Sequence, residues 1–221
     1  QVARQNMALT LLEVGDLPGA TSLQEQVLEA YSKSLPNDHH DVQGARLNLA
    51  NSRRKAGDLL GTLELEEAVL AAFLRTLPDN HPDLQSARHN LAGTKLLLGD
   101  VPGALALQEQ VLAVRARTLP DEHPDLQAAR QGLANIRRGL GDLPGAFALQ
   151  EQVFAVWSKN LPDDHPTLQA ARLPLAGLKE ALGDLAGAIA LQEKVLTVWS
   201  ESLPDDHPYL QSARQGLANT K

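Results

Sequence analysis

The sequence predicts an all-α solenoid in which helical hairpins stack on one another. A motif that begins with Leu-Pro starts every 42 residues, at Leu35, Leu77, Leu119, Leu161 and Leu203. Between these motifs apolar residues recur at helical spacing, which indicates two amphipathic helices per unit. Aromatic residues make up only 3% of the chain, so the core must be built from Leu, Val and Ala. Such a core suits closely packed helices better than a β-sandwich.

The period also predicts the domain organisation. The chain reads as a truncated repeat (1–34), four full repeats (35–76, 77–118, 119–160 and 161–202) and a half repeat (203–221). Because each unit can contact only its neighbours, we expect residues 1–221 to form a single solenoid domain.

The first helix of a unit is illustrated by the unit 77–118. Its apolar positions are Leu84, Ala87, Leu91, Ala92 and Leu98. Pro82 suits the first turn of this helix, where no intrahelical hydrogen bond is lost. Gly99 is the natural residue just after the helix, because it can adopt a positive φ. The sequence therefore predicts a helix that starts near Pro82 and ends before Gly99.

The second helix of the same unit follows at once, with Asp100 as its expected N-cap and Pro102 near its start. One apolar stripe contains Ala104, Leu107, Val111 and Val114, and a second one, Leu105 and Leu112, lies beside it. A helix that is apolar over so wide an arc must be covered on two sides. We expect its own partner helix on one side and the first helix of the next unit on the other.

The order Asn-Leu-Ala, Gly-Asp, an Ala four residues after that Asp, and a branched apolar residue seven later resembles the tetratricopeptide repeat. The 42-residue period and the Asp-x-His-Pro junction are most similar to the longer variant of kinesin light chains and bacterial regulatory arrays. Ala92, Gly99, Ala104 and Val111 stand at the family's packing positions, although Val111 replaces the usual Ala. Arg88 is another departure, because the 34-residue form prefers a large aromatic residue there. The resemblance implies a right-handed superhelix of antiparallel helical hairpins, with the first helices lining its concave surface.

Composition restricts the classes of function. A net charge of −7 disfavours nonspecific binding of nucleic acid or anionic lipid. Without cysteine there is no disulfide framework and no thiolate zinc site. No apolar run approaches the roughly 18 residues that span a membrane. We expect a cytoplasmic protein without a cofactor, although the chain opens on Gln1 in mid-pattern and a leader could precede it.

The junction motif, LPDDHP at 161–166, combines two carboxylates with a histidine and so invites a metal-site hypothesis. The acidic positions vary between copies, however: Asn37 replaces the first carboxylate, and Asn80 the second. A metal site would not tolerate such exchanges. We therefore interpret the motif as a turn that starts a helix, with the histidine at or next to the N-cap, and predict no metal site.

One arginine and one glutamate recur in every full unit. The pairs are Arg46 with Glu67, Arg88 with Glu109, Arg130 with Glu151, and Arg172 with Glu193. Each arginine lies midway along the first helix and each glutamate midway along the second, within an arginine's reach in an antiparallel hairpin. We expect structural ion pairs that fix helix register rather than a ladder of anion-binding arginines.

The resemblance also implies candidate positions for a peptide-binding groove on the first helices. The candidates are Asn6, Asn48, Asn51, Arg54, His89, Asn90, Gln131, Asn135, Arg138, Gln215 and Asn219. The asparagines are similar to those that hydrogen-bond an extended ligand in peptide-binding members of the family, and an amide both donates and accepts. The family's clamp for a terminal carboxylate also needs a Lys where this chain has Leu47 or His89.

Two further features of the first helices leave alternatives open. A basic patch could be formed by Arg53, Arg54, Lys55, Lys95, Arg137 and Arg138. The same residues could instead be solvated helix ends that interact with the helix dipole. Pro174 should kink or loosen the helix in which it lies, because it removes the backbone bond to Ala170.

These observations predict a noncatalytic scaffold that binds a peptide or partner segment of a protein in the groove of the first helices. The alternative is a structural spacer or self-assembling array. Both ends lack an obvious polar cap, which predicts end-to-end or lateral self-association. Catalysis is disfavoured because no set of titratable groups converges, and no nucleic acid or membrane partner is expected.

Overall fold

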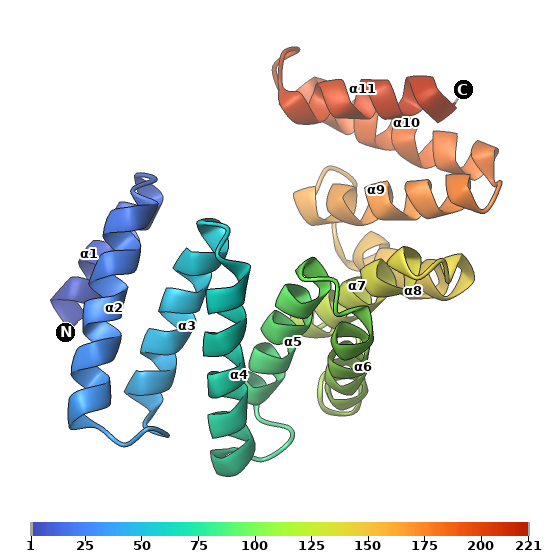
Figure 1. The fold of residues 1–221 in the computed structure, drawn as a ribbon. Helices are drawn as coiled ribbons and strands as arrows, with labels where there is room; N and C mark the ends of the chain where they lie inside the picture. The colour runs from blue at the N-terminus through green and yellow to red at the C-terminus, as the bar shows by residue number, and fades with distance from the viewer. Residues whose placement is uncertain (1, 221) are drawn as a thin grey trace. The chain divides into compact units, whose positions relative to one another are not determined.

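The computed structural model describes residues 2–220 of the chain, with side chains from Arg4 onward, as helices joined by short turns (Figure 1). The helices are α1 (Val2–Glu13), α2 (Leu17–Ser34), α3 (His40–Lys55), α4 (Leu59–Thr76), α5 (Pro82–Leu97), α6 (Val101–Thr118), α7 (Pro124–Gly139), α8 (Leu143–Asn160), α9 (Pro166–Ala181), α10 (Leu185–Ser202) and α11 (Pro208–Thr220). No strand occurs among these described residues. Odd-numbered helices are the first helices of the 42-residue units and even-numbered helices are the second ones.

The chain divides into two compact units, Gln1–Val114 and Arg115–Lys221, with the boundary inside α6. In the first unit, each helix from α1 to α4 packs on the helix that follows it. The same holds from α7 to α10 in the second unit. This consecutive packing of hairpins confirms the predicted all-α class, whereas the single-domain organisation stays a prediction.

The core shows why each second helix has a wide apolar arc. In the second unit, Ala146 of α8 packs between Ala134 of α7 and Leu178 of α9. In the first unit, Val69 and Phe73 of α4 pack against the following helix α5. Each of these second helices is therefore covered by the next first helix, as the sequence predicted. Burying a side chain of the size of Val69 or Leu178 stabilises the fold by about 1.5–3 kcal/mol.

The buried stripe of α6 differs from the expected one by a single residue. Ala104, Val111 and Val114 are buried as expected, but Leu107 is only half-buried and the neighbouring Gln108 is buried instead. Hydrophobic periodicity passes over this position because it counts only apolar residues. Equivalent buried side chains are Gln24, Glu66, Gln150 and Gln192.

The turn between the two helices of a unit is set by Gly99 and Asp100, as predicted. Gly99 has φ +84°, a left-handed conformation that suits glycine. The Asp100 carboxylate accepts the Gly103 N–H at 3.0 Å and so caps α6. A Cβ on residue 103 would overlap this carboxylate, which explains the glycine there. The four other units repeat the same cap, with Asp16, Asp58, Asp142 and Asp184.

α9 extends through Pro174 rather than ending there, and Ala170, whose backbone bond the proline removes, lies on an exposed part of the helix. No helix within residues 2–220 combines the length and the apolar character needed to cross a membrane.

Candidate functional site

The junction motif forms a turn followed by a histidine N-cap. The Pro162 carbonyl accepts the His165 N–H at 3.0 Å, so the turn begins at the proline. His165 then caps α9, because its Nδ1 accepts the Thr167 N–H at 3.2 Å. The other junctions repeat this arrangement with His39, His81, His123 and His207. The motif therefore starts the helix that follows it, as the sequence predicted.

The arginine that recurs in each unit binds this junction loop and not the glutamate that the sequence predicted. Arg88 Nη1 lies 2.7 Å from the Asp79 carboxylate, and Arg172 binds Asp163 in the same way. Arg130 pairs with Asp121 at 2.5 Å, and Arg46 bonds to Asn37. The reason is side-chain direction: a long helical side chain points toward the helix N-terminus, here toward the loop that precedes its own helix. These contacts with the junction loop replace the predicted pairs Arg46–Glu67, Arg88–Glu109, Arg130–Glu151 and Arg172–Glu193.

A glutamine that the sequence analysis missed holds the same loop residue. Gln169 Nε2 donates to the Asp163 carbonyl at 2.5 Å, while its Oε1 accepts from Arg172 at 3.0 Å. The equivalent residues are Gln43, Gln85, Gln127 and Gln211. Their recurrence every 42 residues was the available signal. The first acidic position of the motif thus has fixed partners, whereas Asp164 at the second position makes no ion pair among the described residues.

The glutamates of the second helices have other partners. Glu25 lies 2.9 Å from Arg53, and Glu67 lies 3.3 Å from Lys95. Both bases lie in the last turn of the next first helix. Such contacts join the second helix of one unit to the following unit.

The candidate basic patch is largely neutralised by these and related contacts. Arg54 binds Glu66, whose side chain is almost completely buried. Lys95 also lies 3.1 Å from Asp100, and Arg137 lies 3.8 Å from Asp142. Arg138 is exposed and has no acidic partner within the described residues. The geometry therefore favours structural helix-end contacts for most of these bases, Arg54 included.

One group of side chains is close enough to suggest a metal site. Ligand atoms of His39, His40 and Asp41 lie within 4.8 Å of one another. However, His39 Nδ1 already accepts the Asp41 N–H at 3.2 Å as part of the N-cap. The two imidazole rings are stacked with centroids 4.5 Å apart, so they do not converge on a common point. The cap accounts for this cluster, and we assign it no metal.

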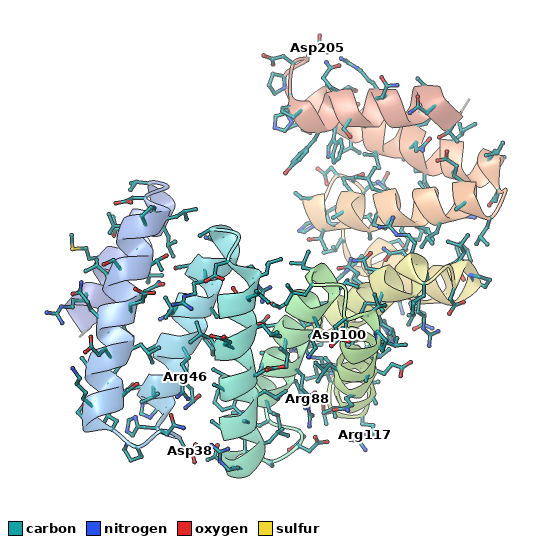
Figure 2. The ribbon with its side chains drawn as sticks, viewed as in Figure 1. Asp38, Arg46, Arg88, Asp100, Arg117 and Asp205 are labelled. Atoms are coloured by element: carbon teal, nitrogen blue, oxygen red, sulfur yellow. The ribbon has the colours of Figure 1, made fainter. Side chains whose placement is uncertain are left out.

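First helices of neighbouring repeats contact one another through side chains in each compact unit. In the first unit, Arg54 of α3 donates to the Asn90 carbonyl (3.3 Å) and to Thr94 Oγ1 (2.9 Å), both on α5. In the second unit, Thr220 of α11 donates to the Glu180 carboxylate of α9 at 3.2 Å. Figure 2 shows Arg46 and Arg88 on the first helices of the first unit, with Asp38 in a junction loop. The candidate groove residues lie on these helices between the turns and the junctions.

Most candidate amides on this face are accessible. Asn6, Asn51, Asn135, Gln215 and Asn219 are exposed, and Asn48, Asn90 and Gln131 are partly exposed. The side-chain amides of Asn48, Asn51 and Asn135 have no hydrogen-bond partner among the described residues. Gln215 and Asn219 bond to each other at 2.8 Å. His89 is less available, because its Nδ1 lies 3.0 Å from Gln108 Oε1.

The comparisons with known proteins agree with this architecture. The sequence pattern of the tetratricopeptide repeat matches residues 2–41, 84–125, 127–167 and 175–209. A crystal structure of a protein from Podospora anserina, described as a kinesin light chain with nearly identical TPR-like repeats, is 31% identical. It superimposes with a TM-score of 0.80 over 90% of this chain and 95% of its own. The sequence has no match among the curated proteins.

More distant structures show the fold alone. BtubC (BKLC) from P. vanneervenii is 17% identical, with a TM-score of 0.74 over 92% of this chain and 82% of its own. Apo RapI is 11% identical, with a TM-score of 0.81 over 99% of this chain and 81% of its own. The consecutive helical hairpins of this chain and their recurring Gly-Asp turns are those of a helical repeat protein. The chain belongs to the tetratricopeptide repeat family.

Proposed function

We propose that the protein is a noncatalytic scaffold that binds an extended segment of a partner protein along the face of its first helices. The observation that carries this proposal is that first helices of both compact units present unpartnered amides. These are Asn48 and Asn51 on α3 in the first unit, and Asn135 on α7 in the second. Exposed amides can donate to and accept from the backbone of an extended peptide. Proteins of the tetratricopeptide repeat family are generally interaction scaffolds, which supports the same reading.

Charge also supports a protein partner. The chain carries a net charge of −7, and most bases of the candidate patch already bind carboxylates of the chain itself. An acidic surface of this kind repels nucleic acid and anionic lipid. We therefore exclude both from the proposed partners.

The experiment compares peptide binding by the chain and by a variant of its groove. An array of short peptides would first identify binding sequences, and fluorescence anisotropy would then give their affinities. We expect the combined variant Asn48→Ala, Asn51→Ala and Asn135→Ala to weaken binding by at least about tenfold, since several hydrogen bonds are lost. Circular dichroism should show the same melting temperature for both proteins.

The control changes amides away from this face. Replacing Asn160, at the end of the second helix α8, by Ala removes an amide that donates to the Val156 carbonyl at 2.8 Å. This variant should bind peptides like the parent chain. Equal binding by the groove variant would overturn the proposal.

A second candidate function, self-association of the array, is favoured by exposed apolar residues on α1. Met7 and Leu9 are 58% and 48% exposed. In light scattering, a self-associating array would gain apparent mass with concentration, and Leu9→Asn should suppress this gain. Asn51 stands at the equivalent position of the next unit, so the substitution suits the helix. A constant mass would exclude this candidate.

A further inference from the structure

The second compact unit contains an apolar pocket on the face of its first helices. Two neighbouring cavities, of about 330 and 580 Å³, share Leu173 of α9, Trp199 of α10 and Tyr209 of α11 as lining residues. Tyr209 is 63% exposed although it is a large aromatic residue. The volumes lie in the range of sites that hold small organic groups.

Comparison with the other units shows why the pocket is particular to this place. Two repeats earlier in the chain, the positions of Trp199 and Tyr209 are occupied by Arg115 and Asp125. There the buried guanidinium of Arg115 donates to the Asp125 carbonyl at 2.9 Å. The rings of Trp199 on α10 and Tyr209 on α11 stack instead, with centroids 5.7 Å apart. A charged contact is thus replaced by a pair of aromatic rings, of which Trp199 is partly buried and Tyr209 is exposed.

A buried hydrogen-bond acceptor in the same pocket has no partner. Gln192 lines the smaller cavity and is only 9% exposed. Its Nε2 donates to Thr220 Oγ1 at 3.0 Å, but its Oε1 has no hydrogen-bond partner. A buried acceptor without a donor destabilises the fold, so such a group indicates a missing donor.

The equivalent acceptor in another unit shows what is missing. Gln108 Oε1 of α6 lies 3.0 Å from Nδ1 of His89 on α5, the first helix of the same repeat. In the last full unit, Leu173 occupies the position of His89. The leucine cannot provide a donor, and it adds an apolar wall instead.

The rim of the larger cavity carries an unpaired negative charge. Asp164 lines this cavity and makes no ion pair with any residue in the described range. The nearby arginines are already bound, Arg172 to Asp163 and Arg214 to Asp205. A cationic group of a ligand would therefore be attracted to Asp164.

We propose that this pocket anchors an extended partner segment by one bulky apolar side chain. The side chain packs against Leu173, Trp199 and Tyr209 and covers the side chain of Gln192. An adjacent Lys or Arg of the segment lies against Asp164. The proposal rests on the proposed groove function and adds to it the location of the anchor and the chemistry of the segment.

The test uses three fluorescein-labelled nine-residue peptides of Gly, Ser and Asn that differ only in a central pair: Phe-Lys, Ser-Lys or Phe-Glu. Fluorescence anisotropy would measure their affinities for the whole chain. We expect the Phe-Lys peptide to bind at least about tenfold more tightly than either of the others.

The variants use residues that other units already carry, so folding is retained. Leu173→Gln together with Tyr209→Asp should abolish the preference for Phe over Ser. Asp164→Asn should abolish the preference for Lys over Glu. The control is Thr167→Asp, which places Asp at the position equivalent to Tyr209 in the preceding repeat, outside the pocket. It should leave both preferences unchanged.

A second readout locates the peptide independently of affinity. In a Trp157→Phe variant, Trp199 is the only tryptophan, and Phe73 shows that Phe is accepted at this position. The Phe-Lys peptide should change the emission of Trp199, and Leu173→Gln should suppress that change.

The outcomes distinguish this inference from the proposed function. If other peptides bind and the asparagine variant loses them, while the three probe peptides show no preference, the groove function stands and the anchor is overturned. Preferences that survive the Leu173, Tyr209 and Asp164 variants would overturn the anchor as well. If no peptide of the array binds, both proposals are overturned.

Discussion

At the scale of single residues, the junction depends on a guanidinium group that reaches back from the helix it starts. Arg172 is 2% exposed, although the Asp163 carboxylate that it binds lies near the surface. Arg172 Nη1 also donates to the Asp163 carbonyl at 3.0 Å and to Gln169 at 3.0 Å. One loop residue is thereby held through both its side chain and its backbone.

Removing this arginine should destabilise the chain without affecting ligand binding directly. We expect Arg172→Met to lower the free energy of unfolding by about 1–3 kcal/mol, because the Asp163 carbonyl and Gln169 lose a buried donor. Urea denaturation followed by circular dichroism measures this change.

The matched variant is Asp163→Asn, which should lower the free energy of unfolding by less than Arg172→Met does. Asn37 occupies the equivalent position and still bonds to Arg46, so an amide is an adequate acceptor there. If Arg172→Met were as stable as the parent chain, the structural role of the arginine would be wrong.

At the scale of the helices, charged caps fix where each second helix begins. Lys179, which lies 2.6 Å away, and the N–H of Gly187 lower the pKa of the Asp184 carboxyl. The Gly103 N–H and Lys95 lower the pKa of Asp100 in the same way. Because these pKa values are lower in the folded chain, the caps stabilise it above the unfolded pKa. The stabilisation is lost as pH falls through the folded pKa.

Acidification should therefore remove the difference between a charged and a neutral cap. At neutral pH we expect Asp184→Asn to be less stable than the parent chain, because Asn caps the helix but does not attract Lys179. The difference should shrink as the pH falls below about 4, where Asp184 of the unfolded chain takes up a proton, and should vanish once the folded carboxyl is protonated as well. Thermal unfolding of both proteins at a series of pH values measures this difference in stability. A difference that grows as the pH falls would contradict the role of Asp184 as a charged cap.

Glycines at two positions of one unit should respond in opposite ways to the same substitution. Gly99→Ala should lower the free energy of unfolding by about 1–2 kcal/mol, because its φ of +84° is unfavourable for Ala. Gly93→Ala, inside α5, should raise it by about 0.5–1 kcal/mol, since Ala favours a helix. A Cβ at Gly93 would meet only Arg54 Nη1 at 3.8 Å, an ordinary contact. Equal effects in chemical denaturation would contradict the assigned roles.

At the scale of the whole chain, the 42-residue period made the hairpins and their caps predictable. Each helix end depends on residues that are close in sequence, such as Gly99 and Asp100, so local patterns suffice. The partner of Arg88 was mispredicted because helical position alone ignores the direction of the side chain. Gln108 was missed because it is polar but buried.

The pocket in the last unit could not be predicted in this way. Leu173, Trp199 and Tyr209 come from three different helices, and none of them is unusual by itself. Only their packing opens a cavity and leaves Gln192 without a donor. The location of a site that departs from the repeat therefore required the structure.

If ligands bind to the face of the first helices, the amide chemical shifts of these helices should change when a ligand is added. The chain would be labelled with nitrogen-15 and titrated with a peptide selected on the array. We predict that the largest changes fall on the first helices, near Asn48 and Asn51 or near Asn135. Changes concentrated on the second helices α4 and α8, with these asparagines unaffected, would contradict the account.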